Sequence, residues 1–527
     1  MLSNSPWIIL AILSSLGMIV MFAETMILPA IPEIIADFQI SYDDSSWILA
    51  LFLVMGAVMT PIAGKLADIY GKKRILLILL AVYSLGVTMG ALSTSYPILV
   101  LARAIQGLGI SIFPIAFSII RDNFAIDKLA VAQGTFSSVL SSGAVIGLIA
   151  GANIIENFGW RATFLLIIPI SITLFCIIKK FIDVRSIGFP HTISDKNSEF
   201  CCKFIHIRRD ILLSESNIRE NELLEETPTS GDIKLHRSID IQGAVALSVT
   251  IVSFLVLLKL IVNASLTNSI FEITILAMVT IFSLVFFVKI ERNTKAPLID
   301  FKLLANRVIL SANIVNMVVG LTALMVVYQS IPILIRSPTP IGFGGDALSV
   351  ANIQLPYMII SLIFSVGSGF LISRIGNLGP TIIGTIVTTI GFLMLFIMHA
   401  TEVSISIVLV LIAVGLAFMQ VGSMNVVLAL TPKQFGGISM GMTLLIYLVG
   451  ASIGPVIAGI FMETNQVTLK EDGIASPTTS DKSFPSSESY NLIFLTATFI
   501  SMTSVAFALY MYKIVTSQEG HLDLSIH

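Results

Sequence analysis

Charged residues are scarce in this sequence. Only 12% of its 527 residues are Asp, Glu, Lys or Arg, whereas 55% are hydrophobic and the mean hydropathy is +0.95. Soluble domains carry about 25% charged residues, so this composition excludes a chain of several soluble domains. The net charge of −2 gives no indication of a nucleic-acid partner, and we expect none.

Cysteine is also rare, with only three residues, which excludes a disulfide framework. Cys201, Cys202 and His206 lie close enough in sequence to be considered as metal ligands. Adjacent cysteines are poor tetrahedral chelators, so we expect neither a metal nor a cofactor. The N-terminus lacks a basic region and the first apolar stretch contains Glu24, so we expect no cleavable signal peptide.

Long apolar stretches are abundant instead. Stretches of about 20 residues recur from end to end, and each is long enough to cross a bilayer as a helix. Open strand edges are excluded in lipid because every backbone polar group must be satisfied internally. The sequence therefore predicts an all-α integral membrane protein with fourteen transmembrane helices. We expect them near residues 6–28, 46–66, 75–94, 97–121, 131–155, 160–182, 241–262, 270–289, 308–334, 348–372, 380–399, 403–427, 436–461 and 490–513.

The distribution of Lys and Arg predicts the orientation. If both termini are cytoplasmic, the inner gaps and helix ends contain 24 of the 30 basic residues and the outer gaps contain four. Cytoplasmic loops carry such an excess, so we expect both termini in the cytoplasm. Arg103 and Lys259 are the two basic residues that remain within spans.

The gaps divide the chain into five predicted parts. Residues 183–240 are polar and mixed in charge, which is typical of a flexible linker, and residues 463–489 form an outer loop rich in Ser, Thr and Pro. The expected parts are an N-terminal six-helix half (1–182), a cytoplasmic linker (183–240), two additional helices (241–290), a C-terminal six-helix half (291–514) and a cytoplasmic tail (515–527).

Glycine spacing indicates that the two halves are duplicates. Gly134, Gly143, Gly147 and Gly151 follow the pattern G-x8-G-x3-G-x3-G, and the first three recur 307 residues later. Gly64, Leu66 and Gly71 recur 305 residues later. Glycines four apart are common wherever membrane helices pack closely, but the shared offset favours a duplication. Parallel repeats with a substrate site between them are typical of secondary transporters.

Several motifs resemble those of the major facilitator superfamily. GKLADIYGKKR at 64–74 resembles its signature loop, and LVLARAIQGLGIS at 99–111 resembles its fourth-helix motif. The glycines of the fifth span resemble its antiporter motif. Fourteen spans, together with GWRATFLLIIPIS at 159–171, DIQGAVAL at 240–247 and APLIDFKLLANR at 296–307, are similar to its drug:proton antiporter branch. The resemblance implies a proton-coupled exporter.

Three positions depart from the pattern of that family. Leu148 stands where the antiporter motif usually has Pro. In the second half, Ser373 occupies the position that Asp68 occupies in the first half. The first span carries Glu24 immediately before Thr25, whereas the branch usually has an Asp two residues before a Thr. The acidic group is therefore displaced by about one position.

Two charged residues within spans are the predicted proton-coupling groups. A charge inside the bilayer costs about 2.5–3.5 kcal/mol on insertion scales, so such residues usually line polar spaces. We expect Glu24 to take up and release protons, although a Glu paired near the outer interface is the structural alternative. Arg103, Gln106 and Gly107 share one helix face. The resemblance associates Arg103 with proton coupling, and a purely structural Arg is the alternative.

The 64–74 loop is predicted to be a conformational latch. Gly64 and Gly71 suit tight turns, and Asp68 is expected to bond Arg74 and cap a neighbouring helix in only one conformer. Polar and bulky residues of other spans are candidates for a substrate cavity, although each polar one also suits helix-to-helix contact. These candidates are Phe113, Asn313, Asn316, Gln329, Asn352, Gln354, Tyr357, Gln420 and Asn425.

The sequence thus predicts a proton-coupled exporter of amphipathic small molecules that works by alternating access in the cell membrane. The alternative is an exporter or importer of one metabolite, such as a siderophore. A respiratory proton pump would need more charges within the membrane, and an ATP-driven pump would need G-x4-G-K-[ST], which is absent. A channel would need a ring of charges, and no nucleophile–His constellation indicates an enzyme. We expect the protein to be a monomer, and the alternative is an assembly with a periplasmic adaptor protein.

Overall fold

The computed structural model describes residues 5–124, 126–182, 241–262, 269–294, 299, 301–376, 378–431, 436–469 and 482–523. Within these residues, fourteen helices are long and apolar enough to cross a membrane. The prediction of an all-α membrane protein with fourteen spans is confirmed. The predicted linker 183–240, with Cys201, Cys202 and His206, lies outside the described residues.

The N-terminal half contains six spans, some of which are interrupted. Its elements are α1 (Pro6–Thr25), η1 (Leu28–Ala30), α2 (Ile31–Phe38), α3 (Tyr42–Ser45), α4 (Trp47–Tyr70), α5 (Lys72–Ala91), α6 (Tyr96–Gly107), η2 (Leu108–Ser111), α7 (Ile112–Asn123), α8 (Ile126–Phe158) and α9 (Trp160–Phe181). Several helices extend beyond the predicted ends, as α8 does on both sides of 131–155, whereas α5 and α18 end two or three residues before them. Polar residues continue these helices past their apolar stretches.

The rest of the chain contains the additional helix pair and the second half. Its elements are α12 (Ile241–Val262), α13 (Ser269–Asn293), α14 (Phe301–Leu304), α15 (Arg307–Thr322), the π-helical η3 (Ala323–Ser330), α16 (Ile331–Arg336), α17 (Ala347–Ile375), α18 (Leu378–Ile397), α19 (Glu402–Leu430), α20 (Gly436–Thr464), β1 (Gln466–Leu469), β2 (Lys482–Pro485) and α21 (Ser487–Asp523).

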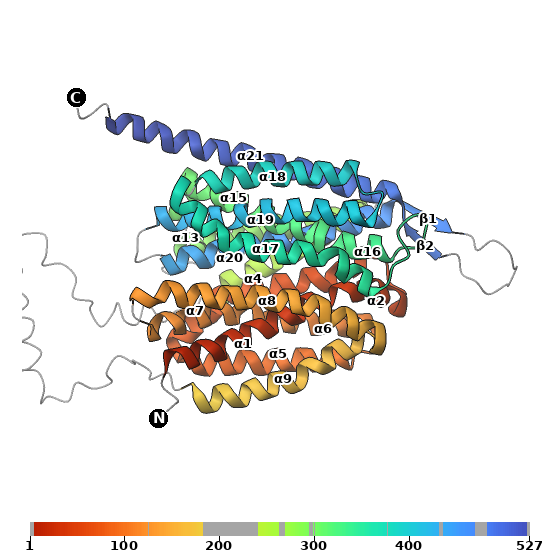
Figure 1. Ribbon diagram of the computed structural model, residues 1–527, viewed down its shortest axis with the longest axis horizontal. Helices are drawn as coiled ribbons and strands as arrows, with labels where there is room; N and C mark the ends of the chain where they lie inside the picture. The colour runs from red at the N-terminus through yellow and green to blue at the C-terminus, as the bar shows by residue number, and fades with distance from the viewer. Residues whose placement is uncertain are drawn as a thin grey trace, which may run out of the picture.

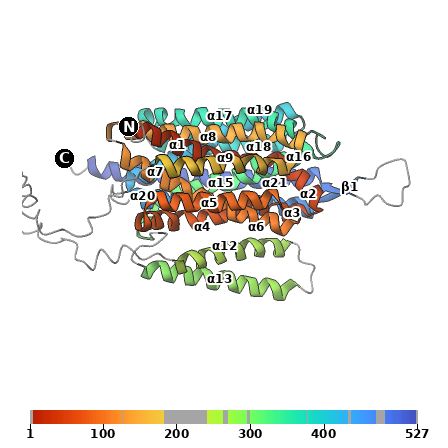
Figure 2. The same ribbon diagram turned by 90° about the horizontal axis from the view of Figure 1, so that it is seen from below.

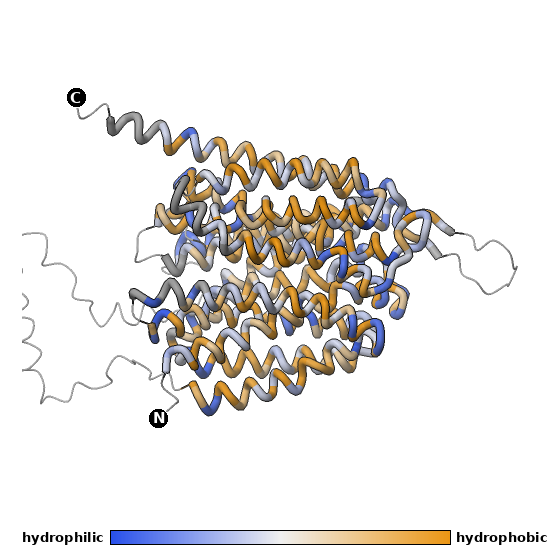
Figure 3. The backbone as a smooth tube through the Cα atoms, viewed as in Figure 1, coloured by the Kyte–Doolittle hydropathy of each residue, from blue (hydrophilic) through white to orange (hydrophobic). Residues whose placement is uncertain are grey.

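The helices run roughly parallel to one another, with the two halves on opposite sides of the bundle (Figure 1). Both marked chain ends lie at the same end of the bundle, which we call the terminal end. The hydropathy colouring is orange along the helices and bluer near their ends, as expected for spans that cross a bilayer (Figure 3). The pair α12–α13 lies beside the bundle, on the side of α4 (Figure 2).

The two halves have matching helix contacts. In the first half, α8 packs on α1, α6 on α5, and α9 on α5. In the second half, α20 packs on α15, α19 on α18, and α21 on α18, which are the equivalent pairs. The contacts between halves are equivalent as well, because α4 meets α20 and α8 meets α17. This arrangement confirms the parallel repeat that the glycine spacing predicts.

The repeated glycines occupy equivalent packing positions. A Cβ added at Gly143 or Gly147 would collide with the backbone carbonyl of Met18 or Phe22 on α1. In the second half, a Cβ at Gly450 would collide with the carbonyl of Met317 on α15. Glycine therefore permits direct backbone contact between the first and fifth helices of each half.

This packing predicts a difference between two glycines of α20. We expect Gly450→Ala to destabilise the folded protein by about 1–3 kcal/mol, because the backbone carbonyl of Met317 cannot move aside easily. Gly441→Ala is the matched control, since nothing lies within 4 Å of a Cβ at that position. Thermal denaturation in detergent, followed by size-exclusion chromatography, measures the difference. Equal transition temperatures for the two variants would contradict this account of the repeat.

Three spans contain irregular helical segments. The α1 helix ends at Thr25, before the 3-10 turn η1, which contains Pro29. The α6 helix passes into the 3-10 turn η2, and α15 passes into the π-helical segment η3. Such segments often occur at functional sites, because they change the direction of side chains and of backbone polar groups.

A short β-hairpin follows α20. Strands β1 and β2 pair antiparallel, with Val467 opposite Phe484. They lie at the end of the bundle away from the termini, which we call the outer end (Figure 1). The sequence predicts only a polar loop over 463–489, and the strands form where residues of high β propensity interrupt it.

Candidate functional site

Glu24 lies at an interruption of the first span. It occupies the last turn of α1, one residue before the helix ends. Thr25, beside it, donates a hydrogen bond of 2.8 Å to the carbonyl of Ala144 on α8. Protein atoms surround the Glu24 side chain, yet it is only half-buried and so retains accessible surface within the bundle. A carboxyl group in this position is accessible to a proton or a ligand.

Arg103 is completely buried in the first half. Its Nε donates to the carbonyl of Ile48 at 3.2 Å, and its Nη1 donates to Oε1 of Gln106 at 2.8 Å. The guanidinium carbon lies 4.3 Å from the centre of the Phe52 ring. These contacts fix the plane of the guanidinium between α6 and α4, whereas its Nη2 is buried without a hydrogen-bond partner.

Gln106 and Gly107 complete the contacts of the fourth-helix motif. Gln106 donates from Nε2 to the carbonyl of Gly86 on α5 at 3.1 Å. A Cβ added at Gly107 would collide with the carbonyl of Phe52, so glycine is needed for the close approach of α6 and α4. The motif therefore joins three helices around Arg103.

Three partly unsatisfied polar groups interact around Glu24. The Glu24 carboxylate and the Arg103 guanidinium attract each other, but they form no ion pair within 4.0 Å in this part of the described structure. The hydroxyl of Tyr83 is buried without a hydrogen-bond partner and interacts electrostatically with both. The groups are near enough to influence one another and are not locked in direct pairs.

Two tyrosines of the second half lie near Glu24, and a third, Tyr357, packs against one of them. Tyr328 and Tyr447 interact electrostatically with Glu24, although they belong to different helices of the opposite half. The rings of Tyr328 and Tyr357 are 6.5 Å apart and nearly perpendicular. Tyr328 and Tyr447 are half-buried. The sequence predicts only Tyr357 here, because the π-helical segment that places Tyr328 leaves no clear signal in the apolar stretch.

Four predicted cavity residues are buried, and their side-chain amides donate hydrogen bonds to other helices or to their own helix. Asn316 donates to the carbonyl of Thr443 at 3.2 Å, Gln354 donates to the carbonyl of Val327, and Gln329 donates to Oγ of Ser45 at 3.1 Å. Asn313 donates to the carbonyl of Ile309 in its own helix at 2.9 Å. Each of these four amides has an oxygen that is buried without a hydrogen-bond partner.

The other predicted cavity residues differ in exposure. Phe113, Gln420 and Asn425 are half-buried, whereas Asn352 is exposed. Asn425 donates to the carbonyl of Val421 within its own helix at 2.8 Å. Their roles in substrate binding remain predictions.

The predicted latch loop lies at the terminal end. Gly71 has a φ of 95°, which favours glycine, and it separates α4 from α5. Nothing lies within 4 Å of a Cβ at Gly64 or Gly71, and Arg74 is exposed. The side chain of Asp68 lies outside the described residues. The structure adds an ion pair of Lys72 with Asp122 at the end of α7, which the sequence does not indicate.

Polar contacts join the two halves at the outer end. Arg336 donates to the carbonyl of Pro29 at 2.9 Å and lies 3.8 Å from Glu33. The backbone N–H of Tyr42 donates to the carboxylate of Glu463 at 3.0 Å. These contacts hold α16 against η1 and α2, and α20 against α3.

A further contact between the halves occurs where α17 begins. The backbone N–H of Ala347 donates to the carboxylate of Glu156, at the outer end of α8, at 3.3 Å. Asp346 accepts hydrogen bonds from the backbone N–H and the hydroxyl of Ser349, which lower the pKa of its carboxyl group. Carboxylates are favourable at this helix N-terminus, because its free N–H groups carry partial positive charge.

Two equivalent six-helix halves that meet along α4–α20 and α8–α17 have the architecture of a multi-pass membrane transporter. The family model of the Major Facilitator Superfamily matches residues 13–455. The chain belongs to this superfamily.

Two relatives are named as drug resistance proteins, and one of them also as an export protein. The chain is 27% identical to multidrug resistance protein 3 of Bacillus subtilis, over 89% of this chain and 81% of that protein. It is 24% identical to the tetracenomycin C resistance and export protein of Streptomyces glaucescens, over 88% of this chain and 77% of that protein. Among solved structures, the nucleoside transporter NupG superposes with a TM-score of 0.60 over 96% of this chain and 100% of that one, at 12% identity, which confirms the fold.

Proposed function

We propose that this protein exports amphipathic small molecules in exchange for protons, by alternating access between its two halves. The observation that carries this proposal is the carboxyl group of Glu24. It is acidic, lies at mid-span, retains accessible surface and makes no ion pair or hydrogen bond within the described structure. Such a group can bind a proton in one conformer and release it in the other.

Arg103 supports proton exchange at Glu24. Its permanent charge favours the ionised carboxylate, and its Nη2 and the Tyr83 hydroxyl are free to bond it after a small movement. When substrate binds, its positive charge can replace the proton on Glu24. Export of a monovalent cation against 100 mV costs about 2.3 kcal/mol, and entry of one proton returns the same amount. A one-for-one exchange therefore moves no net charge, and the pH gradient drives it.

The substrate class follows from the groups opposite Glu24. Tyr328 and Tyr447 offer ring faces, with Tyr357 packed against Tyr328, and Glu24 offers negative charge. Aromatic faces and a carboxylate together suit organic cations with an apolar or aromatic body. The similarity to proteins named as multidrug resistance and export proteins supports this choice.

The tyrosine cluster gives a testable prediction for substrate affinity. We expect Tyr328→Leu to raise the KM for ethidium by about tenfold and to change kcat little, because a desolvated cation–π contact contributes about 1–2 kcal/mol. Tyr512→Leu is the control, since its side chain is 52% exposed on α21. Ethidium efflux from cells, measured by fluorescence, gives both constants. Equal KM values for the two variants would remove the cluster from the substrate site.

The contacts at the outer end support alternating access. Arg336 with Pro29 and Glu33, and Tyr42 with Glu463, join the halves at this end. Release of substrate there requires these bonds to break, while the repeated glycines allow the first and fifth helices of each half to slide past one another. We propose that the 64–74 loop, with Asp68 and Arg74, stabilises the opposite conformer at the terminal end.

We propose the cell membrane as the location, with the terminal end in the cytoplasm. The excess of Lys and Arg in the gaps at that end supports this orientation. Outward release of substrate then takes place at the end where the β-hairpin lies. The chain acts as a monomer in this proposal, and contact with a periplasmic adaptor would occur at the same outer end.

Transport by inverted membrane vesicles tests the function. A panel of organic cations and single metabolites is offered, with and without an uncoupler. We expect several unrelated cations to accumulate, and the uncoupler to abolish their accumulation. Accumulation that the uncoupler does not affect would reject proton coupling, and transport of one metabolite alone, such as a siderophore, would reject multidrug export.

A further inference from the structure

Helix α12 covers an interface between the two halves. It packs against α4 of the first half and against α20 of the second, which also pack against each other. Buried apolar side chains from all three helices meet in a cluster that includes Val54, Leu255 and Val456. Trp47, at the outer end of α4, packs on this cluster and is half-buried. The α4–α20 interface is thus separated from lipid by α12.

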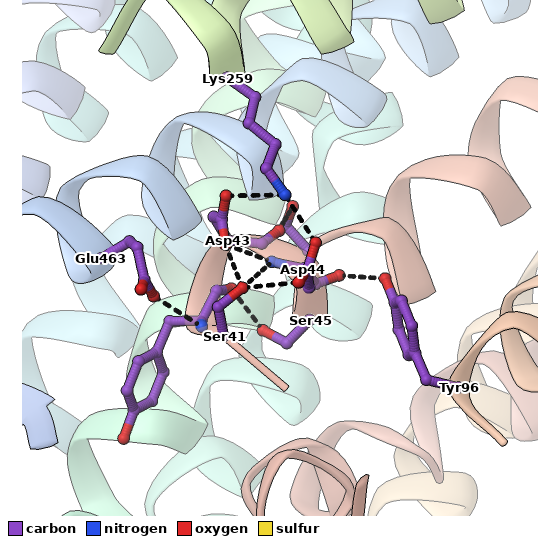
Figure 4. A network of polar contacts seen from close by, with 9 residues as sticks. Ser41, Asp43, Asp44, Ser45, Tyr96, Lys259 and Glu463 are labelled. Carbon is purple, nitrogen blue, oxygen red and sulfur yellow. Dashed lines mark hydrogen bonds and ion pairs between the residues drawn. The ribbon is translucent and has the colours of Figure 1, made fainter. Parts of the chain in front are cut away.

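The outer end of α12 carries a charged residue that requires a partner. Lys259 is the only charged residue of α12. Its Nζ is 2.9 Å from Oδ2 of Asp43 and 2.6 Å from Oδ1 of Asp44, both on the short helix α3 (Figure 4). The Asp43 side chain is only 4% exposed, and Lys259 supplies a positive charge beside it. The Ser41 hydroxyl and the N–H of Asp44 also donate to the Asp43 carboxylate.

Helix α3 is where α12 and both halves of the protein meet. The hydroxyl of Tyr96 on α6 donates to the carbonyl of Asp44 at 2.6 Å, as Figure 4 shows. From the second half, Glu463 of α20 accepts from the N–H of Tyr42. A Cβ at Gly459 of α20 would approach the Cα of Asp43 too closely, so the two backbones are in direct contact. Removal of Lys259 would therefore disturb a junction of three parts.

We propose that the α12–α13 pair is a lateral seal, which closes the α4–α20 interface to lipid and to amphiphiles dissolved in the bilayer. The ion pairs of Lys259 with Asp43 and Asp44 fix the outer end of the seal on the first half. Among the described helices, none packs across the equivalent α8–α17 interface as α12 does across α4–α20. The seal makes the transporter asymmetric towards the membrane.

The motion of the two halves explains why a seal is needed at this interface. When the halves rock, the contact between α4 and α20 changes, and a gap would admit lipid chains. Apolar packing of α12 tolerates sliding, since it has no directional bonds. The ion pairs are directional, so they hold α12 on α3 while α20 moves relative to both.

Trp47 reports the state of the seal. The protein is reconstituted in vesicles of phosphatidylcholine brominated near the chain end closest to the headgroup, and bromine quenches any tryptophan that lipid chains contact. The quenching of Trp47 is obtained as the difference in fluorescence between each protein and the same protein with Trp47→Phe. Trp7, which is 48% exposed, stays in place as the internal standard for quenching.

We expect weak quenching of Trp47 in the unmodified protein and about a twofold larger quenching constant in Lys259→Met, because the ion pairs that hold α12 on α3 are then lost. Lys259→Arg is the matched control and retains weak quenching. Asp44→Asn removes one of the two ion pairs that hold α12, so we expect a smaller rise in quenching from it; it is the second variant if Lys259→Met does not fold. Unchanged quenching in Lys259→Met and in Asp44→Asn would overturn the proposal. The measurement needs neither substrate nor a proton gradient, so it is independent of the proposed function.

Discussion

Glu24→Gln is expected to abolish proton-driven transport. The amide keeps the size and polarity of the side chain but cannot release a proton at physiological pH. Loss of a group that transfers protons typically reduces rates by about 10²–10⁴-fold, and we expect at least a hundredfold decrease here. Proteoliposomes with an imposed pH gradient and ethidium as substrate measure the rate.

Two controls separate coupling from folding. Glu402→Gln removes an exposed carboxylate in the first turn of α19, and we expect normal transport from it. Substrate exchange across vesicles without a pH gradient tests whether the Glu24→Gln protein still changes conformation. If Glu24→Gln retained its proton-driven rate, Glu24 would not be the coupling group.

Arg103→Lys is expected to reduce transport by about a hundredfold, although the charge is conserved. Lysine cannot reproduce the donations to the Ile48 carbonyl and to Gln106, together with the contact to the Phe52 ring. The ammonium group would therefore leave the plane in which the guanidinium interacts with Glu24 and Tyr83. The pH profile of transport is the decisive readout, because a structural defect alone would lower the rate at every pH.

The matched control for Arg103→Lys is Arg121→Lys. Arg121 has a side-chain exposure of 62% at the end of α7, and its replacement should have little effect. A rate and pH profile equal to the unmodified protein in Arg103→Lys would show that only the positive charge matters. The fixed geometry described above would then have no role in coupling.

The sequence predicts most of the fold because membrane spans have a strong and local signal. Apolar length specifies the fourteen helices, and the glycine offsets indicate the repeat, since only glycine permits backbone contacts such as those of Gly143 and Gly450. The interrupted helices were less predictable. Pro29 marks one interruption, but the π-helical segment at 323–330 depends on packing between helices.

The candidate site was predictable where a charge lies within a span, as for Glu24 and Arg103. Tyr328 and Tyr447 could not be predicted as site residues, because aromatic residues are common in apolar helices and the direction of their side chains depends on the tertiary fold. Asp43 and Asp44 lie in a polar gap of the sequence, where carboxylates are ordinary. Only the structure brings them to Lys259, which is 215 residues away from Asp44.

Proton release on substrate binding tests the central claim most directly. Purified protein in weakly buffered detergent solution is mixed with ethidium, and a pH indicator reports the protons released. We predict that the unmodified protein releases protons at a pH where Glu24 is at least partly protonated, and that Glu24→Gln binds ethidium without releasing any. Equal proton release by the two proteins would contradict the assignment of Glu24 as the site where substrate and proton exchange.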